Sequence, residues 1–219
     1  MRRNVATDRI EDALTAIAAG SMVVVVDDED RENEGDLIMS AEKATTADIA
    51  FMVRYTSGVL CVALPGQRLD ELKLPLMVRE NTDSMRTAFT ITVDYRHETT
   101  TGISASDRAV TVRALVDPRV RAEDFNRPGH IFPLRAVPGG VLRRAGHTEA
   151  AVDLTRLAGL REGGVLAEVV NDDGSMARFD QLCQFARLHR LPIVTIRDLI
   201  AYRKRDADAV SHSLEALSV

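Results

Sequence analysis

The sequence contains no tryptophan and few aromatic residues, and its two cysteines, Cys61 and Cys183, both lie in apolar stretches. A thiol in such a setting usually packs as a small hydrophobic group, and nothing nearby indicates an activated thiol. Two isolated cysteines form no disulfide framework, and the chain shows no signal peptide, so we expect a cytoplasmic protein. No apolar run is long enough to span a bilayer, and we therefore expect no membrane association.

The chain also lacks a concentration of positive charge. Its net charge is −5 and its arginines are scattered, which predicts no nucleic-acid partner. Hydrophobic residues make up 45% and charged residues 28% of the 219 residues, a composition typical of a globular protein with a substantial core. We expect one domain over residues 1–205 and a frayed C-terminal tail over residues 206–219.

Hydrophobic periodicity predicts alternating helices and strands. The expected helices are one capped by Thr7 and ending at Gly20, one after Thr45, one near Ser106, one over 149–158 and one capped by Ser175. The expected strands are 22–26, 59–64, 87–93, 165–170 and 191–196, and the stretch 127–140, rich in proline and glycine, is expected to be irregular. Together these elements predict an α+β fold with a single domain, in which layers of helices cover a mixed β-sheet.

An acidic run directly follows the first apolar strand. Positions 27–36 carry seven carboxylates, whose mutual repulsion raises their pKa values or requires a cation. In an extended segment, Asp30, Glu32, Glu34 and Asp36 fall on one side and form the hard-oxygen surface that Mg²⁺ or Mn²⁺ prefers. A solvated acidic turn is the alternative. A calcium loop of the EF-hand type does not fit, because Ala41 stands where its bidentate glutamate is required.

A second candidate site is the turn at positions 143–148, immediately before a predicted helix. Backbone N–H groups at a helix N-terminus, together with Arg144 and Thr148, form a typical anion site, and Gly146 permits close approach of a phosphate. His147 on the same turn can reach a metal ion held by the acidic run. The alternative is that Thr148 caps the helix and the arginines are solvated.

Two single residues complete the set of candidates. Glu168 is the one polar side chain in an apolar strand, where burial raises the pKa of a carboxylate toward the working range of a general acid or base. The alternative for Glu168 is an edge strand with the side chain in solvent. His130 lies between two prolines, and from the residues alone it is most often a structural hydrogen-bonding group.

Several motifs in order resemble those of the dihydroxybutanone phosphate synthases. They are positions 27–36, 100–108 (TTGISASDR), 127–135, 146–150 (GHTEA) and 171–174 (NDDG). The resemblance covers nearly the whole chain, although the segment 79–86 matches only loosely. It implies the α+β fold already expected and a riboflavin-biosynthesis reaction that converts D-ribulose 5-phosphate to L-3,4-dihydroxy-2-butanone 4-phosphate and formate.

The resemblance also implies Mg²⁺ as cofactor, with Mn²⁺ as the other candidate, and a homodimer with its active site near the interface. It assigns Glu32 and His147 as metal ligands and His130 and Glu168 as catalytic acid–base residues, with His130 able to serve the neighbouring subunit. The implied substrate contacts are Arg31, Glu32, Asp36, Arg144, Ala145, Gly146, His147, Thr148 and Glu168.

Two other functions use the same sequence features. A metal-dependent sugar-phosphate isomerase or aldolase requires the same carboxylates, histidines and phosphate site but releases no formate. A nucleotide or double-stranded RNA binding module requires a basic concave face and no metal, and the acidic run argues against it.

Overall fold

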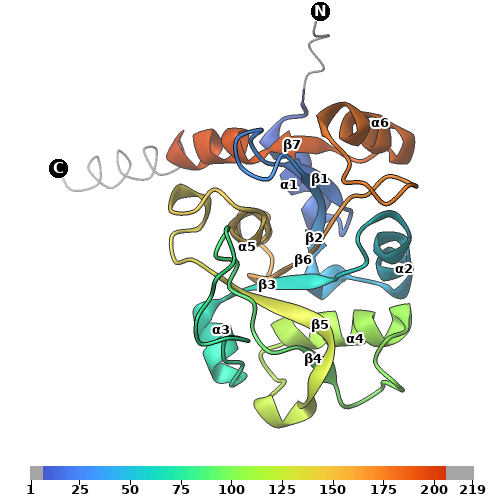
Figure 1. The fold of residues 1–219 in the computed structure, drawn as a ribbon, viewed down its shortest axis with the longest axis vertical. Helices are drawn as coiled ribbons and strands as arrows, with labels where there is room; N and C mark the ends of the chain where they lie inside the picture. The colour runs from blue at the N-terminus through green and yellow to red at the C-terminus, as the bar shows by residue number, and fades with distance from the viewer. Residues whose placement is uncertain (1–6, 206–219) are drawn as a thin grey trace, which may run out of the picture.

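The computed structural model describes residues 7–205, so the predicted tail at 206–219 lies outside the described residues. Within this range the strands form one seven-stranded mixed sheet in the order β4-β5-β3-β6-β2-β1-β7 (Figure 1). The strands are β1 (Val23–Val26), β2 (Gly35–Ser40), β3 (Cys61–Pro65), β4 (Val93–Tyr95), β5 (Phe125–Ala136), β6 (Gly164–Glu168) and β7 (Ile193–Thr195). Pairing is parallel for β1–β7 and β3–β5 and antiparallel for the other neighbours, which confirms the predicted mixed sheet.

Helices cover both faces of this sheet. They are α1 (Ile10–Ala18), α2 (Thr46–Tyr55), α3 (Gly66–Glu71), α4 (Ala105–Val116), α5 (His147–Leu157) and α6 (Phe179–His189), and residues 196–205 are also helical. Figure 1 shows α5 on the opposite side of the central strands from α2 and α4. No helix among the described residues is long and apolar enough to cross a membrane.

The two faces of the sheet bury two separate hydrophobic cores. Alternate residues of β1 divide between them: Val24 packs with α2, α4 and α6, whereas Val23 packs with α1 and α5. All four valines of β1 are buried, as expected of a central strand covered on both faces. Hydrophobic packing on both faces therefore fixes the position of the central strands.

The largest error of the sequence prediction concerns residues 127–140. Most of this segment belongs to β5, which pairs in parallel with β3 over its C-terminal half and antiparallel with β4 over its N-terminal half. Pro133 lacks an N–H donor, but its carbonyl accepts a hydrogen bond from the Thr90 N–H at 2.9 Å. Partners distant in sequence therefore build a strand that local composition argues against.

Smaller corrections concern strand 87–93 and two helix caps. Residues 87–92 make only isolated bridges, and the strand β4 begins at Val93. Thr7 does not cap α1, because its hydroxyl donates to Asp198 at 3.3 Å. Ser175 does not cap α6, because its hydroxyl donates to Asp173 at 2.6 Å within the preceding turn. The strand β2, which was not predicted, forms because its backbone pairs with β1 and β6.

Gly35 at the start of β2 provides a test of this packing. A Cβ atom at this position would lie 2.5 Å from Leu182 Cδ1 of α6. Because overpacking a close contact costs about 1–3 kcal/mol, we expect Gly35→Ala to lower the free energy of unfolding by that amount in urea titrations. Combined with Leu182→Ala, the loss should be smaller than the sum of the two single losses. Additive losses would show that the two residues do not interact.

Candidate active site

The predicted site residues Asp36 and Glu168 meet where β2 and β6 pair. The antiparallel register places Asp36 directly opposite Glu168, at the start of β2 and the end of β6. The acidic run connects β1 to β2, so it lies at the same edge of the sheet. The N-terminus of α5 reaches this edge as well, because the Nε2 atom of His147 lies 3.1 Å from the Val25 carbonyl oxygen.

These elements enclose a pocket of about 220 Å³. Side chains of β3, β5 and β6, most of them apolar, line it together with acidic and basic groups. The lining residues are Arg31, Glu32, Glu34, Asp36, Cys61, Asp83, Met85, Thr87, Phe89, Leu134, Arg144, His147, Thr148, Leu166 and Glu168. A small pocket lined by several charged groups suits a compact, charged ligand.

His147 is held in an orientation suited to binding a metal. Its Nε2–H donates to the Val25 carbonyl, which directs Nδ1 toward the carboxylates. Nδ1 lies 3.5 Å from Glu32 Oε2 and 3.8 Å from Asp36 Oδ1. Among residues 7–205, Asp36 Oδ1 is buried without a hydrogen-bond partner. An imidazole nitrogen and two carboxylates around an unpaired buried oxygen fit a hard divalent cation.

Without a cation, this cluster shifts the pKa of each member. Burial, with repulsion from neighbouring glutamates, raises the pKa of Asp36 to about 7, although the charge of His147 opposes the shift. Burial lowers the pKa of His147, but the neighbouring carboxylates, Asp36 foremost, outweigh burial and raise this pKa to about 9. The hydrogen bond from His147 lowers the pKa of Glu32 to about 2 against the effect of burial. The imidazolium of His147 thus balances charge that a cation would otherwise balance.

Asp27 is a site residue that sequence reasoning missed. Ligand atoms of Asp27, Glu32 and His147 lie within 4.8 Å of one another, close enough to share an ion. Asp27 also accepts hydrogen bonds from the backbone N–H groups of Glu32 and Glu34 at 3.0 and 2.9 Å. It is the residue that folds the acidic run into a loop. The sequence prediction assumed an extended segment, in which alternate side chains share one side. It therefore placed the carboxylates of the even-numbered positions 30–36 at the metal and omitted Asp27.

The two arginines that line the pocket are held by carboxylates. Arg31 lies 2.9 Å from Asp27 Oδ2 and 2.5 Å from Glu32 Oε2. Arg144 donates to the buried Glu149 at 2.7 Å and to the Met85 carbonyl at 3.1 Å. Each guanidinium retains donors for an anion in the pocket while its orientation is fixed.

The turn at positions 143–148 is only partly confirmed as a lining element. Helix α5 begins at His147, and its N-cap is Gly146, so Thr148 does not cap the helix. Thr148 lines the pocket, whereas Ala145 and Gly146 do not. Gly146 has a structural reason to be glycine, because a Cβ atom would lie 2.9 Å from Glu149 Oε2 and would overlap the guanidinium of Arg144.

Of the two predicted acid–base residues, only Glu168 lies in this pocket. It is half-buried and accepts a hydrogen bond from the Ser57 hydroxyl at 2.6 Å. His130 lies on β5 and does not line the pocket, and its Nδ1 lies 2.6 Å from Asp94 Oδ2. One chain therefore does not bring His130 together with the residues around Glu168.

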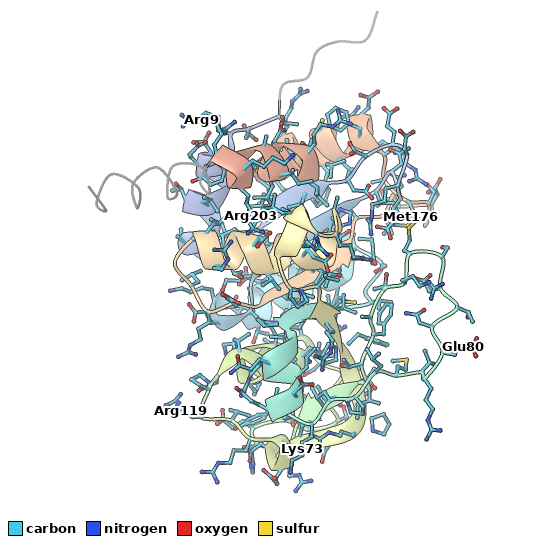
Figure 2. The ribbon with its side chains drawn as sticks, turned by 90° about the vertical axis from the view of Figure 1, so that its left-hand side faces the viewer. Arg9, Lys73, Glu80, Arg119, Met176 and Arg203 are labelled. Atoms are coloured by element: carbon cyan, nitrogen blue, oxygen red, sulfur yellow. The ribbon has the colours of Figure 1, made fainter. Side chains whose placement is uncertain are left out.

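The loop between α3 and β4 was also missed as a site element. Figure 2 shows this loop, marked by Glu80, standing out from the side of the molecule. It contributes Asp83, Met85 and Thr87 to the pocket wall. Neither periodicity nor a motif distinguishes these residues in the sequence. The hydrogen bond from Arg144 to the Met85 carbonyl links their loop to the pocket.

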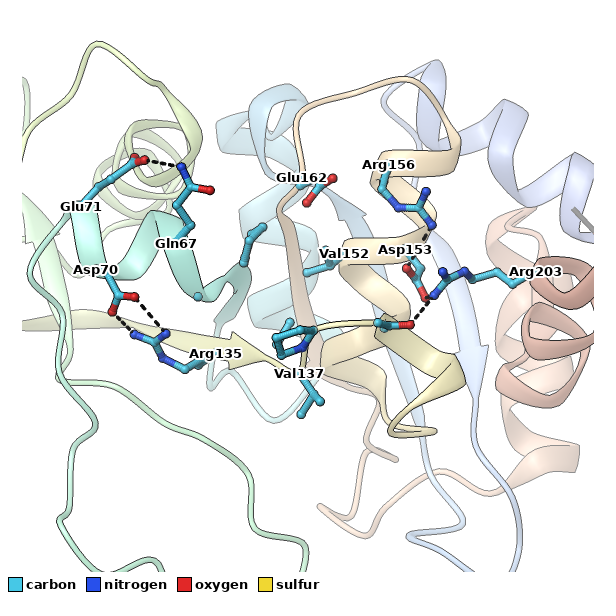
Figure 3. A pocket seen from close by; sticks show the side chains of 16 residues that line it. Gln67, Asp70, Glu71, Arg135, Val137, Val152, Asp153, Arg156, Glu162 and Arg203 are labelled. Carbon is cyan, nitrogen blue, oxygen red and sulfur yellow. Dashed lines mark hydrogen bonds and ion pairs between the residues drawn. The ribbon is translucent and has the colours of Figure 1, made fainter. Parts of the chain in front are cut away.

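A larger cleft of about 860 Å³ lies elsewhere, beside α3, the end of β5 and α5 (Figure 3). Its arginines are already paired: Arg135 with Asp70, and both Arg156 and Arg203 with Asp153. None of the predicted site residues lines it among the residues described. We therefore assign the candidate active site to the smaller pocket, where the unpaired buried carboxylate lies.

Comparison with known proteins finds relatives along most of the chain. Residues 11–202 match the family described as 3,4-dihydroxy-2-butanone 4-phosphate synthase. The chain is 62% identical over 196 residues to the 3,4-dihydroxy-2-butanone 4-phosphate synthase of Agrobacterium fabrum, covering 90% of this chain and 92% of that protein. It is 58% identical over 211 residues to the riboflavin biosynthesis protein RibBA of Rhodococcus erythropolis, with 95% of this chain covered, but spans 50% of that longer protein.

A solved structure extends the likeness to three dimensions. A crystal structure of a 3,4-dihydroxy-2-butanone 4-phosphate synthase in complex with two magnesium ions superposes with a TM-score of 0.88. The identity is 47%, and the match covers 90% of this chain and 97% of that one.

The raised pKa of His147 predicts that cation binding depends on pH. A cation at Nδ1 must displace the proton that the metal-free site holds up to a pKa of about 9. The apparent affinity for Mg²⁺ should therefore rise from pH 6.5 to 9, by up to roughly tenfold per unit, and level off above that range. Calorimetry in buffers of different ionisation enthalpy measures the proton release directly.

The exposed His97 supplies the control for this measurement. His97→Asn should leave the pH dependence unchanged, whereas His147→Asn should weaken binding and flatten its pH dependence. An affinity that stays constant between pH 6.5 and 9 in the unaltered protein would rule out His147 as a ligand.

Proposed function

The chain belongs to the 3,4-dihydroxy-2-butanone 4-phosphate synthase family, lyases of riboflavin biosynthesis, and we propose that it converts D-ribulose 5-phosphate to L-3,4-dihydroxy-2-butanone 4-phosphate and formate. We also propose Mg²⁺ as the cofactor, with Mn²⁺ as an alternative, and the cytoplasm as the location. The magnesium complex of the solved relative supports the choice of metal. The cluster around Asp36 offers the carboxylate and imidazole ligands that suit a hard divalent cation.

The observation that carries the proposal is the position of the cation cluster beside an anion-binding helix terminus. His147 belongs to the cluster and is also the first residue of α5, and Thr148 follows it in the pocket wall. Arg144 supplies a guanidinium on the same wall. A phosphate bound by Arg144, Thr148 and the first turn of α5 would leave the sugar oxygens next to Glu32 and Asp36. A phosphorylated polyol fits this arrangement, because its phosphate would meet the arginine and the helix terminus while its hydroxyl oxygens would meet the cation cluster.

The proposed chemistry begins with enolisation, which requires a proton to be moved between neighbouring carbons. Glu168 lies opposite Asp36 across the strand pair and is the group proposed to accept or return this proton. When bound, the divalent cation supplies electrophilic stabilisation of the enediolate oxygens. Arg31 orients Glu32, and Arg144 orients the phosphate, so the reacting carbons are held in one position. The five-carbon substrate then yields a four-carbon product and one carbon as formate.

We further propose that the active form is a homodimer in which His130 serves the pocket of the neighbouring subunit. Within one chain His130 lies outside the pocket of Glu168. Exposed apolar side chains adjoin both groups: Val59 is 42% exposed and binds Ser57 through its N–H, and Ile103 is 52% exposed and follows Gly102 beside His130. Such surface favours burial against a second copy.

Formate release tests the proposed function. Incubation with ribulose 5-phosphate and Mg²⁺ should release one formate per substrate consumed, and EDTA should stop the reaction until Mg²⁺ is restored. An isomerase or aldolase acting on the same substrate consumes it without forming formate. Substrate turnover with no formate would therefore replace the proposed reaction with one of these.

Replacement of Glu168 tests its proposed role. Glu168→Gln keeps an oxygen that accepts the hydrogen bond from Ser57 but removes the titrating proton. Turnover should fall by about 10²–10⁴, the usual contribution of positioned proton transfer. Thermal unfolding should occur at the same or a higher temperature, because the charge of Glu168 repels the buried Asp36.

Glu162→Gln is the matched control, since Glu162 lines the larger cleft outside the site. It should leave turnover unchanged. If Glu168→Gln remains active and unfolds several degrees lower, Glu168 acts as a structural ion-pair partner and the catalytic assignment is wrong.

A further inference from the structure

We propose that Arg203, in the C-terminal helix at 196–205, is a positioning residue for phosphate binding: it holds the loop at 137–146 and so fixes Arg144 in the pocket wall. This inference rests on the proposed function, in which Arg144 binds the substrate phosphate. Arg203 lines the larger cleft and not the pocket, so it acts on the pocket through the loop.

One nitrogen of Arg203 makes both of the contacts that hold the loop. Its Nη1 donates to the Gly139 carbonyl at 2.7 Å and to Asp153 Oδ2 at 2.8 Å. The same carboxylate oxygen accepts from the Val141 N–H at 2.9 Å. Figure 3 shows Arg203 reaching from its helix toward Asp153. Gly140 is therefore held on both sides, through the carbonyl before it and the N–H after it.

The turn that these contacts hold consists of two successive glycines. Gly139 and Gly140 have φ values of +98° and +64°. Glycine adopts this left-handed conformation readily, but it loses more conformational freedom on folding than any other residue, so an outside contact is needed to fix such a turn. A Cβ atom at Gly140 would overlap both carboxylate oxygens of Asp153 and lie 2.6 Å from Arg203 Nη1. The ion pair thus lies directly against the loop backbone.

Backbone hydrogen bonds join this turn to Arg144. The Gly140 carbonyl accepts from the N–H groups of Arg143 and Arg144 at 2.9 and 3.1 Å. The Arg144 side chain then reaches Glu149 of α5 at 2.7 Å and lines the pocket. A shift of the turn would move the Arg144 backbone while Glu149 stays in place on its helix. The guanidinium would then lose the position that a bound phosphate requires.

The helix that carries Arg203 is packed firmly enough to hold the loop. Ile196 and Leu199 are buried in the same hydrophobic core as Val141. The Arg203 side chain is 17% exposed and the Asp153 side chain 4% exposed. Salt screens an ion pair that is this far withdrawn from water less than it screens a surface pair. The pair can therefore transmit the position of the helix to the loop.

Arg156 provides a comparison within the same cleft. Its Nη2 lies 3.4 Å from Asp153 Oδ1, and its side chain is 41% exposed. Among the described contacts it makes no hydrogen bond to the loop at 137–146. Replacing Arg156 thus removes a cation from Asp153 and keeps the contact to Gly139, whereas replacing Arg203 removes both.

Arg203→Met tests the inference, because it keeps a long aliphatic side chain and removes the donors. In the formate assay, KM for ribulose 5-phosphate should rise about tenfold with kcat changed by less than about threefold, as expected when binding is lost without a change in the chemical step. Inhibition by inorganic phosphate should weaken by a similar factor. Arg156→Met should leave all three constants unchanged.

Three measurements separate positioning from a general loss of structure. The affinity for Mg²⁺ in calorimetry should be the same in Arg203→Met as in the unaltered protein. Arg203→Lys should restore most of KM, because a single nitrogen makes both contacts. Added to Arg144→Ala, Arg203→Met should raise KM little further. An equal loss of Mg²⁺ affinity, or a full additional rise in KM, would overturn the inference.

An unchanged KM in a folded Arg203→Met would also overturn it. If that variant does not fold, Gly140→Ala supplies the test, because its Cβ must displace the ion pair or the turn, and an unchanged KM would again overturn the inference. If the unaltered protein forms no formate, the proposed function fails, and calorimetry with inorganic phosphate still tests Arg203. If the unaltered protein is active and Arg203→Met has the same KM, only the role of Arg203 fails.

Discussion

The buried carboxylate of Asp36 is the constraint on which the rest of the site depends. It is one of a pair of facing residues on two central strands, and one of its oxygens has no hydrogen-bond partner among residues 7–205. A charge in that position is costly unless another charge compensates it. The protonated His147 does so in the absence of metal, and a divalent cation would do so more completely. The α5 N-terminus and the acidic loop are arranged around that requirement.

Helix α5 also fastens the loop that precedes it. Glu149 and Asp153, one turn apart and both buried, accept hydrogen bonds from the backbone N–H groups of Val137 and Val141 at 3.0 and 2.9 Å. Glu149 binds Arg144 as well. One face of α5 therefore fixes the conformation of the loop that connects β5 to the pocket. Because Arg144 belongs to this loop and binds Glu149, its guanidinium is fixed as well. The site is rigid because strands and a helix, more than its loops, hold the charged groups.

The sequence was sufficient for the features that depend on local order. The mixed sheet covered by helices, the pocket residues Glu32 and His147, and the isolated polar Glu168 at a strand end followed from periodicity, charge density and motif order. It was insufficient where distant segments decide the outcome. The strand β5 requires β3 and β4 as partners, Asp27 acquires its role only when the acidic run folds back, and the loop at Met85 reaches the pocket through Arg144. For β5 and Met85, hydrogen bonds between distant segments override or supplement the local preference, whereas Asp27 is placed by hydrogen bonds within its own loop.

Helix α5 begins at His147, and its N-cap residue, Gly146, has no side chain that could form a capping hydrogen bond to the first turn. Exposed N–H donors at a helix start are normally satisfied by such a cap, and leaving them open lowers helix stability by about 1 kcal/mol. In the proposed binding mode, the substrate phosphate takes the place of the missing cap. The substrate is then a component of the fold, and the enzyme would resist unfolding more strongly as the concentration of its own substrate increases, by about 2.7 kcal/mol at one hundred times the dissociation constant.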